Sequence, residues 1–264
     1  VDPNAGDLKA AADALATDYE AELGKKMTVA TGSNPAAGDI YFTLDKSDNG
    51  LGEEGYVMES DSYVKVTAAH QTGAYWATRS IIQIAELNEG KLPKGTTRDY
   101  PKYEVRGFML DVARKPVSME TLEDVAKEMA YYKMNALHVH LNDNLIFYED
   151  FATTEEAREK AYTGFRLESD IKKDGNGGKN KADLTNKDMH YTKEEFRKFI
   201  LDCRAMGVDI IPEFDTPGHS GAFTKVRPDL MLQKTMEGNA KRAGEQFDLS
   251  DEKYADSLAF VQSV

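Results

Sequence analysis

The stretch from Val208 to Ser220, with the sequence VDIIPEFDTPGHS, decides the fold class of this chain. It begins with a short run of apolar, largely β-branched residues, which is typical of a buried strand. Acidic residues, a proline and a glycine then end the run, and Glu213, Asp215 and His219 follow one another closely. Titratable groups at the carboxyl end of a strand lie where barrels and open α/β sheets bind ligands. A plain turn with locally bonded polar side chains is the alternative interpretation of this one stretch.

A second stretch has the same character. It runs from Leu137 to Asp150 with the sequence LHVHLNDNLIFYED. His138 and His140 are two residues apart, so they share one face of a strand, and Asp143 follows where that strand ends. Two strands that bring carboxylates and imidazoles to one rim favour a functional site. Two alternatives stay open for the histidines: they are core residues bonded to their neighbours, or they are half of the zinc site of a metal-dependent barrel hydrolase.

The segment from residue 101 onward alternates between strand-like and helical periodicity. The pattern predicts strands at 105–112, 136–141 and 208–214 and helices at 118–132 and 191–206. Strands separated by helices form a parallel sheet with crossover connections, so the predicted fold class is α/β. The connection at 148–190 is too long for an ordinary loop and predicts an insertion over the active face.

The first hundred residues predict a separate α+β domain. Helical spacing marks residues 7–23 and 71–87, and the expected strands are 27–30, 39–44, 56–60 and 63–68. Trp76 lies in the middle of the second helix among apolar neighbours, which favours core packing over stacking on a sugar. The segment 93–101, PKGTTRDYP, is rich in turn residues and predicts the linker. The expected domains are therefore residues 1–100 and 101–264.

The composition argues against several classes of partner. The 264 residues include 46 acidic and 33 basic side chains, which gives a formal net charge of −13. This charge argues against nucleic acid or an anionic membrane surface. The single cysteine, Cys203, excludes an internal disulfide, and no apolar run approaches the roughly 20 residues of a membrane span. The chain starts without methionine, so we expect a processed or excised segment.

Three motifs together resemble a known family. They are VRGFMLDVAR at Val105–Arg114, then YYKMNALHVHLND, then IPEFDTPGH, and their order and spacing resemble glycoside hydrolase family 20, the β-N-acetylhexosaminidases. The preceding AAHQTGAYWATRSIIQI is similar to the helix before the family's barrel. The resemblance implies an α+β domain followed by a (β/α)8 TIM barrel that removes terminal N-acetylhexosamine, or a disaccharide containing it, from β-linked glycans. Its partners are then glycans. We expect no cofactor and, with only five histidines in the sequence, no metal, and we expect an extracellular or cell-surface bacterial location.

The resemblance also implies a mechanism. In substrate-assisted catalysis the substrate's own 2-acetamido carbonyl attacks the anomeric carbon, a glutamic acid protonates the leaving oxygen, and an adjacent aspartate orients the acetamido nitrogen. Carried over to this sequence, Arg106 matches the arginine that holds the sugar hydroxyls. The polar residues that support the acid are matched by Asp143, Asp215, His219 and His140. Arg106 lies at the start of its predicted strand, away from the mouth, so either that boundary is displaced or the side chain reaches far.

One departure from the family pattern bears on the substrate. After the HxHL strand the family commonly has two aspartates and a nearby tryptophan, whereas this chain has Asn144 in the second place and Phe147 near the aromatic position. The segment NDNLIF is more similar to a branch that includes lacto-N-biosidases, which release a disaccharide. Release of a monosaccharide and release of a disaccharide therefore both stay open.

The length of the second segment predicts an incomplete barrel. A full barrel of this type needs about 250 residues, and residues 101–264 hold about three βα units. We therefore expect the catalytic Asp-Glu pair beyond Val264 and no hydrolysis by this chain alone. The dipeptide Asp251-Glu252 lies at the start of a predicted helix, where the helix dipole favours acidic residues, so it needs no catalytic role. An open sheet edge predicts self-association. A non-catalytic glycan-binding module is the third class of function that stays open.

Overall fold

The computed structural model of this chain describes residues 1–144, 152, 164–171, 183–186, 189–235 and 241–264. These residues form two compact units, and each unit is made of three separate stretches of the chain. The first unit comprises Val1–Arg106, Val125–Asn135 and Cys203–Val208, and the second holds the remainder. Two segments that follow residue 101 belong to the first compact unit, so a single cut in the chain does not separate the units.

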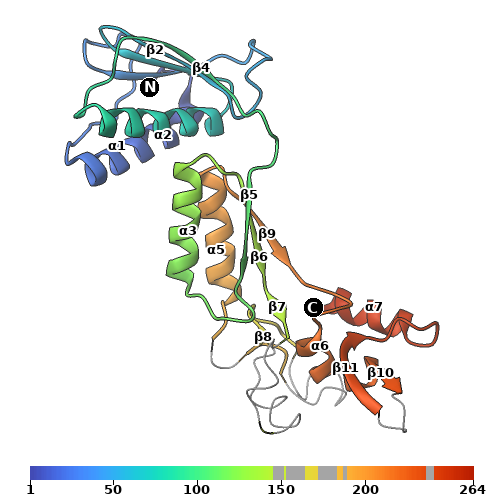
Figure 1. Cartoon of the computed structure of the whole chain (residues 1–264). Helices are drawn as coiled ribbons and strands as arrows, with labels where there is room; N and C mark the ends of the chain where they lie inside the picture. Colours follow the sequence, from blue (N-terminus) through green and yellow to red (C-terminus); the bar gives the residue numbers. More distant parts are fainter. Residues whose placement is uncertain (145–151, 153–163, 172–182, 187–188, 236–240) are drawn as a thin grey trace. The chain divides into compact units, whose positions relative to one another are not determined.

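The first unit contains a four-stranded sheet in the order β1-β3-β2-β4 (Figure 1). Its strands are Ile40–Leu44 (β1), Tyr56–Ser60 (β2), Val64–Ala68 (β3) and Gly95–Asp99 (β4). β1 and β3 run parallel, whereas β2 is antiparallel to both of its neighbours. β1, β2 and β3 form where strands were predicted at 39–44, 56–60 and 63–68. The linker expected at 93–101 instead contains β4, because pairing with β2 imposes an extended conformation that its turn-rich sequence did not indicate.

The strand expected at 27–30 does not form. The first residues of the chain meet β1 instead: the Asp2 amide donates to the Phe42 carbonyl at 2.9 Å. The amino group of Val1 donates to the Ala30 carbonyl at 2.8 Å. Residues 27–30 therefore bond to the start of the chain and not to the sheet.

The helical elements of the first unit are a 3-10 turn at Gly6–Leu8 (η1), Lys9–Leu23 (α1) and Gln71–Leu87 (α2). The two α-helices pack against each other beside the sheet (Figure 1). Gly24 ends α1 in the left-handed conformation (φ 66°), which glycine adopts without steric cost. Trp76 is 2% exposed, and its indole N–H donates to Glu54 Oε2 at 2.9 Å. The prediction that Trp76 packs in the core is therefore confirmed.

The second unit is built on a three-stranded parallel sheet in the order β5-β6-β9. Its strands are Gly107–Asp111 (β5), Ala136–His140 (β6) and Asp209–Glu213 (β9), and they are connected through Met119–Tyr131 (α3) and Lys193–Ala205 (α5). This is the strand–helix–strand–helix–strand order that the sequence predicted. It is the arrangement with which a (β/α)8 barrel begins.

Local signals explain where the two crossover helices begin. Ser118 Oγ accepts the N–H of Thr121 at 3.1 Å, which is an N-cap of α3. Before α5, Thr192 Oγ1 accepts the N–H of Glu195 at 3.1 Å, and the Glu195 carboxylate accepts the N–H of Thr192 at 2.9 Å. The capping box predicted from the sequence at Thr192 is therefore present.

The two faces of the parallel sheet differ in burial. On β6, Leu137 and Val139 are completely buried. His138 alternates with them and lies on the opposite face, in one row with Met109 of β5 and Ile211 of β9. Met109 and Ile211 are 53% and 49% exposed. The face that carries the histidine is thus open in the described part of the chain.

The segment between β6 and α5 adds a short ladder at the end of the sheet. Asn142–Asp143 (β7) pairs antiparallel with Gly164–Phe165 (β8). Arg166 follows and is 1% exposed, and its guanidinium donates to three backbone carbonyls. The acceptors are the carbonyls of Val112, Ala113 and Met189. An insertion was expected at 148–190; its described residues are anchored beside the end of β6, and its other residues lie outside the described part of the chain.

The chain after β9 folds around an aromatic cluster. Its elements are Gly221–Val226 (α6), a 3-10 turn at Pro228–Leu230 (η3), a hairpin of Met231–Thr235 (β10) and Lys241–Phe247 (β11), and Tyr254–Ser263 (α7). The rings of Phe223 and Phe247 stack with centroids 6.0 Å apart, and Phe260 packs against both. A helix was predicted where α7 forms, whereas the hairpin was not predicted.

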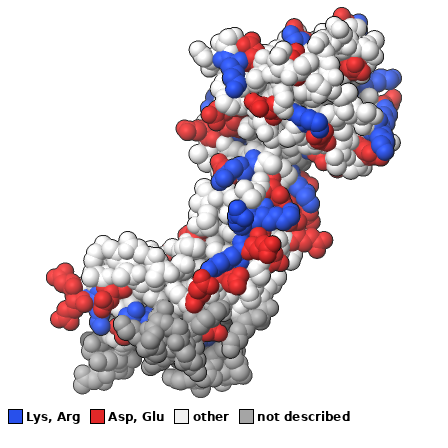
Figure 2. Space-filling view, turned by 180° about the vertical axis from the view of Figure 1, so that it is seen from behind, with Lys and Arg blue, Asp and Glu red and all other residues white. Residues whose placement is uncertain are grey.

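The surface of the described residues carries charges of both signs. On the face drawn in Figure 2, acidic side chains lie beside basic ones. Lys9 pairs with Asp13 on α1, and Lys198 pairs with Asp202 on α5, each one helical turn apart. Exposed pairs of this kind contribute little to stability. None of the described helices combines the length and the apolar character that crossing a membrane requires.

Candidate active site

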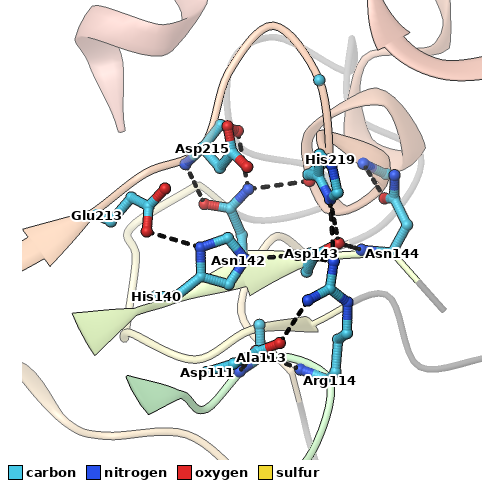
Figure 3. A network of polar contacts seen from close by, with 12 residues as sticks. Asp111, Ala113, Arg114, His140, Asn142, Asp143, Asn144, Glu213, Asp215 and His219 are labelled. Atoms are coloured by element: carbon cyan, nitrogen blue, oxygen red, sulfur yellow. Dashed lines mark hydrogen bonds and ion pairs between the residues drawn. The ribbon is translucent and has the colours of Figure 1, made fainter. Parts of the chain in front are cut away.

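Polar side chains meet at the carboxyl end of the β5-β6-β9 sheet (Figure 3). Asp111, His140 and Glu213 form one row across the three strands, because Asp111 pairs with His140 and His140 pairs with Glu213. Residues in one row of a sheet point to the same face. The segments that follow the strands add further charged groups. The resulting rim cluster consists of Asp111, Arg114, His140, Asp143, Glu213, Asp215 and His219.

His140 lies between two carboxylates. Its Nδ1 is 2.7 Å from Glu213 Oε2, and its Nε2 is 2.5 Å from Asp143 Oδ2. The same Glu213 oxygen lies 2.6 Å from Nε2 of His138. Burial acts to lower the pKa of the His140 imidazole. Hydrogen bonds to Glu213 and Asp143 outweigh burial, so the pKa of His140 is raised above its ordinary value.

The carboxylate of Asp143 is the centre of the rim cluster, and its side chain is 1% exposed. Oδ2 faces Nε2 of His140 and lies 2.6 Å from the Arg114 guanidinium. Oδ1 accepts the Nδ1 proton of His219 and the backbone N–H of Asn144, both at 2.5 Å. Burial acts to raise the pKa of Asp143, but hydrogen bonds from His219, from a backbone amide and from His140 outweigh it and lower that pKa. Asp143 is thus held as an ionised carboxylate.

Arg114 reaches the rim cluster from the turn after β5. Asp111 Oδ1 accepts the backbone N–H groups of Ala113 and Arg114, each at 3.0 Å, so the last residue of the strand shapes the turn. The guanidinium lies 2.7 Å from Asp111 Oδ2 and 2.6 Å from Asp143 Oδ2. Among the described residues its buried Nε has no hydrogen-bond partner. Two carboxylates therefore fix a rigid fork of donors at the mouth of the sheet.

Two asparagines tie the segment after β9 to the end of β6. The Asn142 amide donates to the carbonyls of Asp215 at 2.9 Å and His219 at 3.0 Å. Its Oδ1 accepts the N–H of Asp215 at 2.9 Å. Asn144 Oδ1 accepts the N–H of Gly221 at 2.8 Å. The turn that carries Asp215 and His219 is therefore fixed by the neighbouring strand and not by local bonds alone.

The structure brings four predicted site residues together. One polar side-chain atom from each of Asp143, Asp215 and His219 lies within 4.8 Å of the others. The same holds for His140, Glu213 and Asp215. The two stretches that the sequence analysis placed at one rim do meet there.

Two family models cover this chain. The model described as "Glycosyl hydrolase family 20, catalytic domain" matches residues 103–264, and the model described as "Glycosyl hydrolase family 20, domain 2" matches residues 1–100. The chain belongs to glycosyl hydrolase family 20. The resemblance stated from three motifs is thereby confirmed.

Curated relatives are glycosidases. A β-hexosaminidase of Porphyromonas gingivalis is 30% identical over 237 residues, which are 86% of this chain and 28% of that protein. A β-hexosaminidase of Akkermansia muciniphila is 33% identical over 172 residues, 60% of this chain and 31% of that protein. A lacto-N-biosidase of Bifidobacterium bifidum is 26% identical over 227 residues, 85% of this chain and 17% of that protein. The chain spans less than a third of the length of each of these relatives.

Solved structures of family 20 enzymes share the fold. The N-acetyl-β-hexosaminidase of Streptomyces plicatus superposes with a TM-score of 0.69 at 21% identity and covers 97% of this chain and 50% of its own. The exo-β-N-acetylglucosaminidase of Vibrio harveyi gives a TM-score of 0.66 at 20% identity, over 97% of this chain and 39% of its own. Domain 2 of the family followed by the start of its catalytic TIM barrel, as predicted, is therefore the fold of this chain.

The family resemblance assigned the sugar-holding arginine to Arg106, which the structure does not place in the rim cluster. Arg106 precedes β5, at the amino end of the strand, and belongs to the first unit. Its guanidinium forms a short ion pair with Glu54, and its Nε donates to the Lys133 carbonyl at 2.7 Å. The expectation of a clamping role needs correction, because an acidic partner 52 residues away in the sequence already holds the guanidinium. These contacts give Arg106 a role in the fold.

The arginine that does lie in the rim cluster, Arg114, was not among the predicted site residues. Arg114 ends the motif VRGFMLDVAR and follows the carboxyl end of its strand, which was a usable signal. Asp111, the last residue of β5, was missed although it lies in register with His140. Glu213 was noted without a role.

The aromatic residue expected beside the site is not tested by the described residues. Phe147, taken for the aromatic of the family pattern, lies outside the described residues. Phe165 is 1% exposed and pairs with Asn142 in the β7-β8 ladder. A buried aromatic residue next to the rim cluster therefore comes from within the long connection at 148–190, where sequence spacing did not indicate it.

The rim cluster fits an ion-pair network better than a metal centre. Three groups of three side chains have polar atoms close enough for one ion, and each group includes His140 or His219. Both nitrogens of His140 lie at carboxylate oxygens, and Nδ1 of His219 donates to Asp143. A ring nitrogen that donates a proton has no lone pair for a metal. The guanidinium of Arg114 adds a positive charge 2.6 Å from Asp143.

Proposed function

We propose that this chain forms part of a glycoside hydrolase that removes terminal β-linked N-acetylhexosamine from glycans by substrate-assisted catalysis. Membership of family 20 supports the reaction class. The single observation that carries the proposal is the Asp143–His219 pair, in which a buried carboxylate holds an imidazole at the carboxyl end of a barrel sheet. Such a pair can set both the geometry and the pKa of an acid beside it.

In this proposal the rim cluster supports a general acid that the rest of the barrel supplies. Because Nδ1 of His219 donates to Asp143, Nε2 is the ring nitrogen that is left to contact the acid in this proposal. The His219 side chain is 50% exposed, which leaves it accessible to a further part of the site. Asp215 lies in the same turn, and its backbone N–H and carbonyl are bonded to the Asn142 side chain. The acid, and the aspartate that orients the acetamido nitrogen, come from residues beyond Val264, so the chain alone does not hydrolyse glycosides.

Arg114 is the residue that we propose to hold the sugar hydroxyls. The family resemblance calls for an arginine in this role, and Arg114 lies at the mouth, where ligands of barrel enzymes bind. Asp111 and Asp143 fix its guanidinium, so little side-chain entropy is lost when a sugar binds. Arg106, at the opposite end of the strand, is tied to Glu54.

We propose two candidates for the released sugar, a monosaccharide and a disaccharide. The names of the relatives include β-hexosaminidase and lacto-N-biosidase, which leaves a monosaccharide and a disaccharide as candidates. Asn144 does not decide between them, because its Oδ1 accepts the N–H of Gly221 and so serves the fold. We take N-acetylhexosamine as the first substrate to test and lacto-N-biose as the second.

Two further proposals concern the surroundings of the chain. Met109 and Ile211 are exposed on the face that the remaining barrel strands would cover. Without those strands we expect the chain to self-associate through the open edges of β5 and β9. We also propose an extracellular or cell-surface location, since the proposed substrates are glycans.

The test is an assay of two proteins on two substrates. The chain, and a version that continues about 200 residues beyond Val264, are incubated with a chromogenic β-N-acetylglucosaminide and with a lacto-N-biose glycoside. We expect the longer protein to release chromophore from at least one substrate, with and without EDTA, and the chain to release none. A longer protein that hydrolyses neither substrate contradicts the proposal, and activity abolished by EDTA favours the metal-dependent alternative.

A further inference from the structure

The contacts of His140 extend the rim cluster beyond the Asp143–His219 pair. His140 touches Asp143 on one side and Glu213 on the other, at 2.5 Å and 2.7 Å. Glu213 Oε2 is also 2.6 Å from Nε2 of His138. The line His138–Glu213–His140–Asp143–His219 therefore joins β6, β9 and the segments that follow them into one chain of charged contacts.

We propose that His140 is an imidazolium at neutral pH that links Glu213 to Asp143, and that Glu213 and His140 together act as positioning residues for Asp143. The proposal deepens the proposed function and rests on it for its catalytic consequence. Neither residue is assigned a contact with substrate.

The charge of His140 follows from counting protons. A neutral imidazole has one N–H donor, whereas an ionised carboxylate only accepts. Contacts of 2.7 Å and 2.5 Å at both nitrogens therefore need either an imidazolium or a protonated carboxyl group. Asp143 already accepts from Arg114, His219 and a backbone amide, which favours its ionised form. Glu213 Oε2 faces two ring nitrogens, and an oxygen between two donors is best ionised.

The surroundings of His140 supply the negative charge that an imidazolium needs. The charged and titratable groups that face it are Asp111 and Arg114 from β5 and its turn, His138 and Asp143 from β6 and its end, and Glu213, Asp215 and His219 from β9 and its turn. Four of these are carboxyl groups and one is a guanidinium. The cation at His140 therefore offsets an excess of acidic groups, and the raised pKa of His140 agrees with this.

The position of Asp143 depends on this cation. Its Oδ2 faces His140 and Arg114, which leaves Oδ1 to accept from His219 and from the Asn144 amide. If the contact of His140 is lost, Arg114 alone holds Oδ2, so the orientation of the carboxylate is less firmly fixed. Glu213 is not in hydrogen-bond contact with His219 in the described residues, and yet it sets the orientation of His219 through His140 and Asp143.

The test on this chain is NMR of labelled histidine rings. The sequence has five histidines, so His140→Gln identifies the signals of His140 and the exposed His70→Gln serves as the control. We expect both ring nitrogens of His140 to be protonated at pH 8, and Glu213→Gln to lower its titration midpoint by about one pH unit or more. A neutral His140 with one bare nitrogen at pH 7, or a midpoint unmoved by Glu213→Gln, overturns the inference.

The catalytic consequence is tested in the longer protein. Glu213→Gln should lower kcat/KM at least about tenfold and displace a limb of the pH–rate profile, whereas Glu213→Asp, which keeps the charge, should restore the profile. If both variants lose the same amount of kcat/KM and neither moves the pH–rate profile, Glu213 only stabilises the fold and the positioning role is overturned. The two failures are distinguishable: the NMR result decides the charge of His140 even if the protein hydrolyses no glycoside.

Discussion

His219 Nδ1 lies 2.5 Å from Asp143 Oδ1, although the two residues are 76 positions apart in the sequence. They meet because each follows the carboxyl end of its strand, and the strands β6 and β9 are neighbours in the sheet. Asn142 completes the arrangement, since its side chain bonds the backbone at both ends of the turn that carries His219. The order of the strands, more than any local motif, thus assembles the rim cluster.

The two arginines of the VRGFMLDVAR motif should behave differently when replaced. In the longer protein, Arg114→Lys should lower kcat/KM about a hundredfold, or about 3 kcal/mol, because lysine lacks the planar fork that two carboxylates orient. Arg106→Lys is the matched control and should leave kcat/KM near normal while it lowers the melting temperature. The reverse result would return the clamping role to Arg106.

Glu54 should be a stability residue of the first unit. Its carboxylate accepts the Trp76 indole N–H, pairs with Arg106 and accepts from the Asn135 amide. Glu54→Gln should lower the free energy of unfolding by about 1–3 kcal/mol, because a partly buried charged acceptor is replaced by a neutral group with an unmatched donor. Urea unfolding measures the change. The exposed neighbour Glu53→Gln should change it by less than about 0.5 kcal/mol.

Stability should depend on pH through Asp143 and His140 in opposite directions. The pKa of Asp143 is lowered, so its contribution is complete above the unfolded value of about 3.9 and is lost as pH falls through the folded pKa. The pKa of His140 is raised, so its contribution is complete below about 6.5 and is lost as pH rises through the folded pKa.

Melting temperatures across pH check this dependence. The deficit of Asp143→Asn relative to the natural sequence should shrink on the acid side, and the deficit of His140→Gln should shrink on the alkaline side. His70→Gln replaces an exposed residue, and its melting temperature should stay close to that of the natural sequence at every pH. Deficits of both cluster variants that stay constant from pH 3 to pH 9 would contradict the ion-pair account.

Arg166 should be essential for the turn that carries Arg114. Its buried guanidinium donates to the carbonyls of Val112 and Ala113, directly before Arg114. Arg166→Met leaves those carbonyls without their donors and should cost about 3 kcal/mol of stability, with faster amide exchange at Ala113 and Arg114. Arg197→Met on the exposed side of α5 is the control, with an expected change of less than about 0.5 kcal/mol. Equal stability of the two variants would show that the turn does not depend on Arg166.

The elements that the sequence predicted are those with a strong period and clear ends. Helices α3 and α5 carry caps at Ser118 and Thr192, and β6 and β9 alternate or cluster apolar residues. The elements that it missed depend on partners far away in the sequence. Strand β4 is extended because it pairs with β2. Residues 27–30 do not form the predicted strand, because Asp2 bonds to Phe42 of β1 and Val1 bonds to Ala30.

The candidate site shows the same division. His140, Asp143, Asp215 and His219 were predictable, because polar residues at the end of an apolar strand, or directly after it, lie at its carboxyl end. Arg114 was missed because the resemblance was carried to the first arginine of its motif, although the distance from the end of the strand favoured the last. The partners of Arg106 and Arg166 were not predictable, since Glu54 and the carbonyls of Val112 and Ala113 meet them only in the folded chain.

The most direct test of the account is the pH–rate profile of Asp143→Asn in the longer protein with a chromogenic β-N-acetylglucosaminide. The account predicts that kcat/KM falls at least about a hundredfold and that the limb set by the general acid moves, because the ionised Asp143 no longer holds His219. Asp202→Asn, which removes an exposed helical pair with Lys198, is the control and should leave the profile unchanged. A folded Asp143→Asn protein with near-normal kcat/KM and an unmoved profile would contradict the claim that the rim cluster supports catalysis.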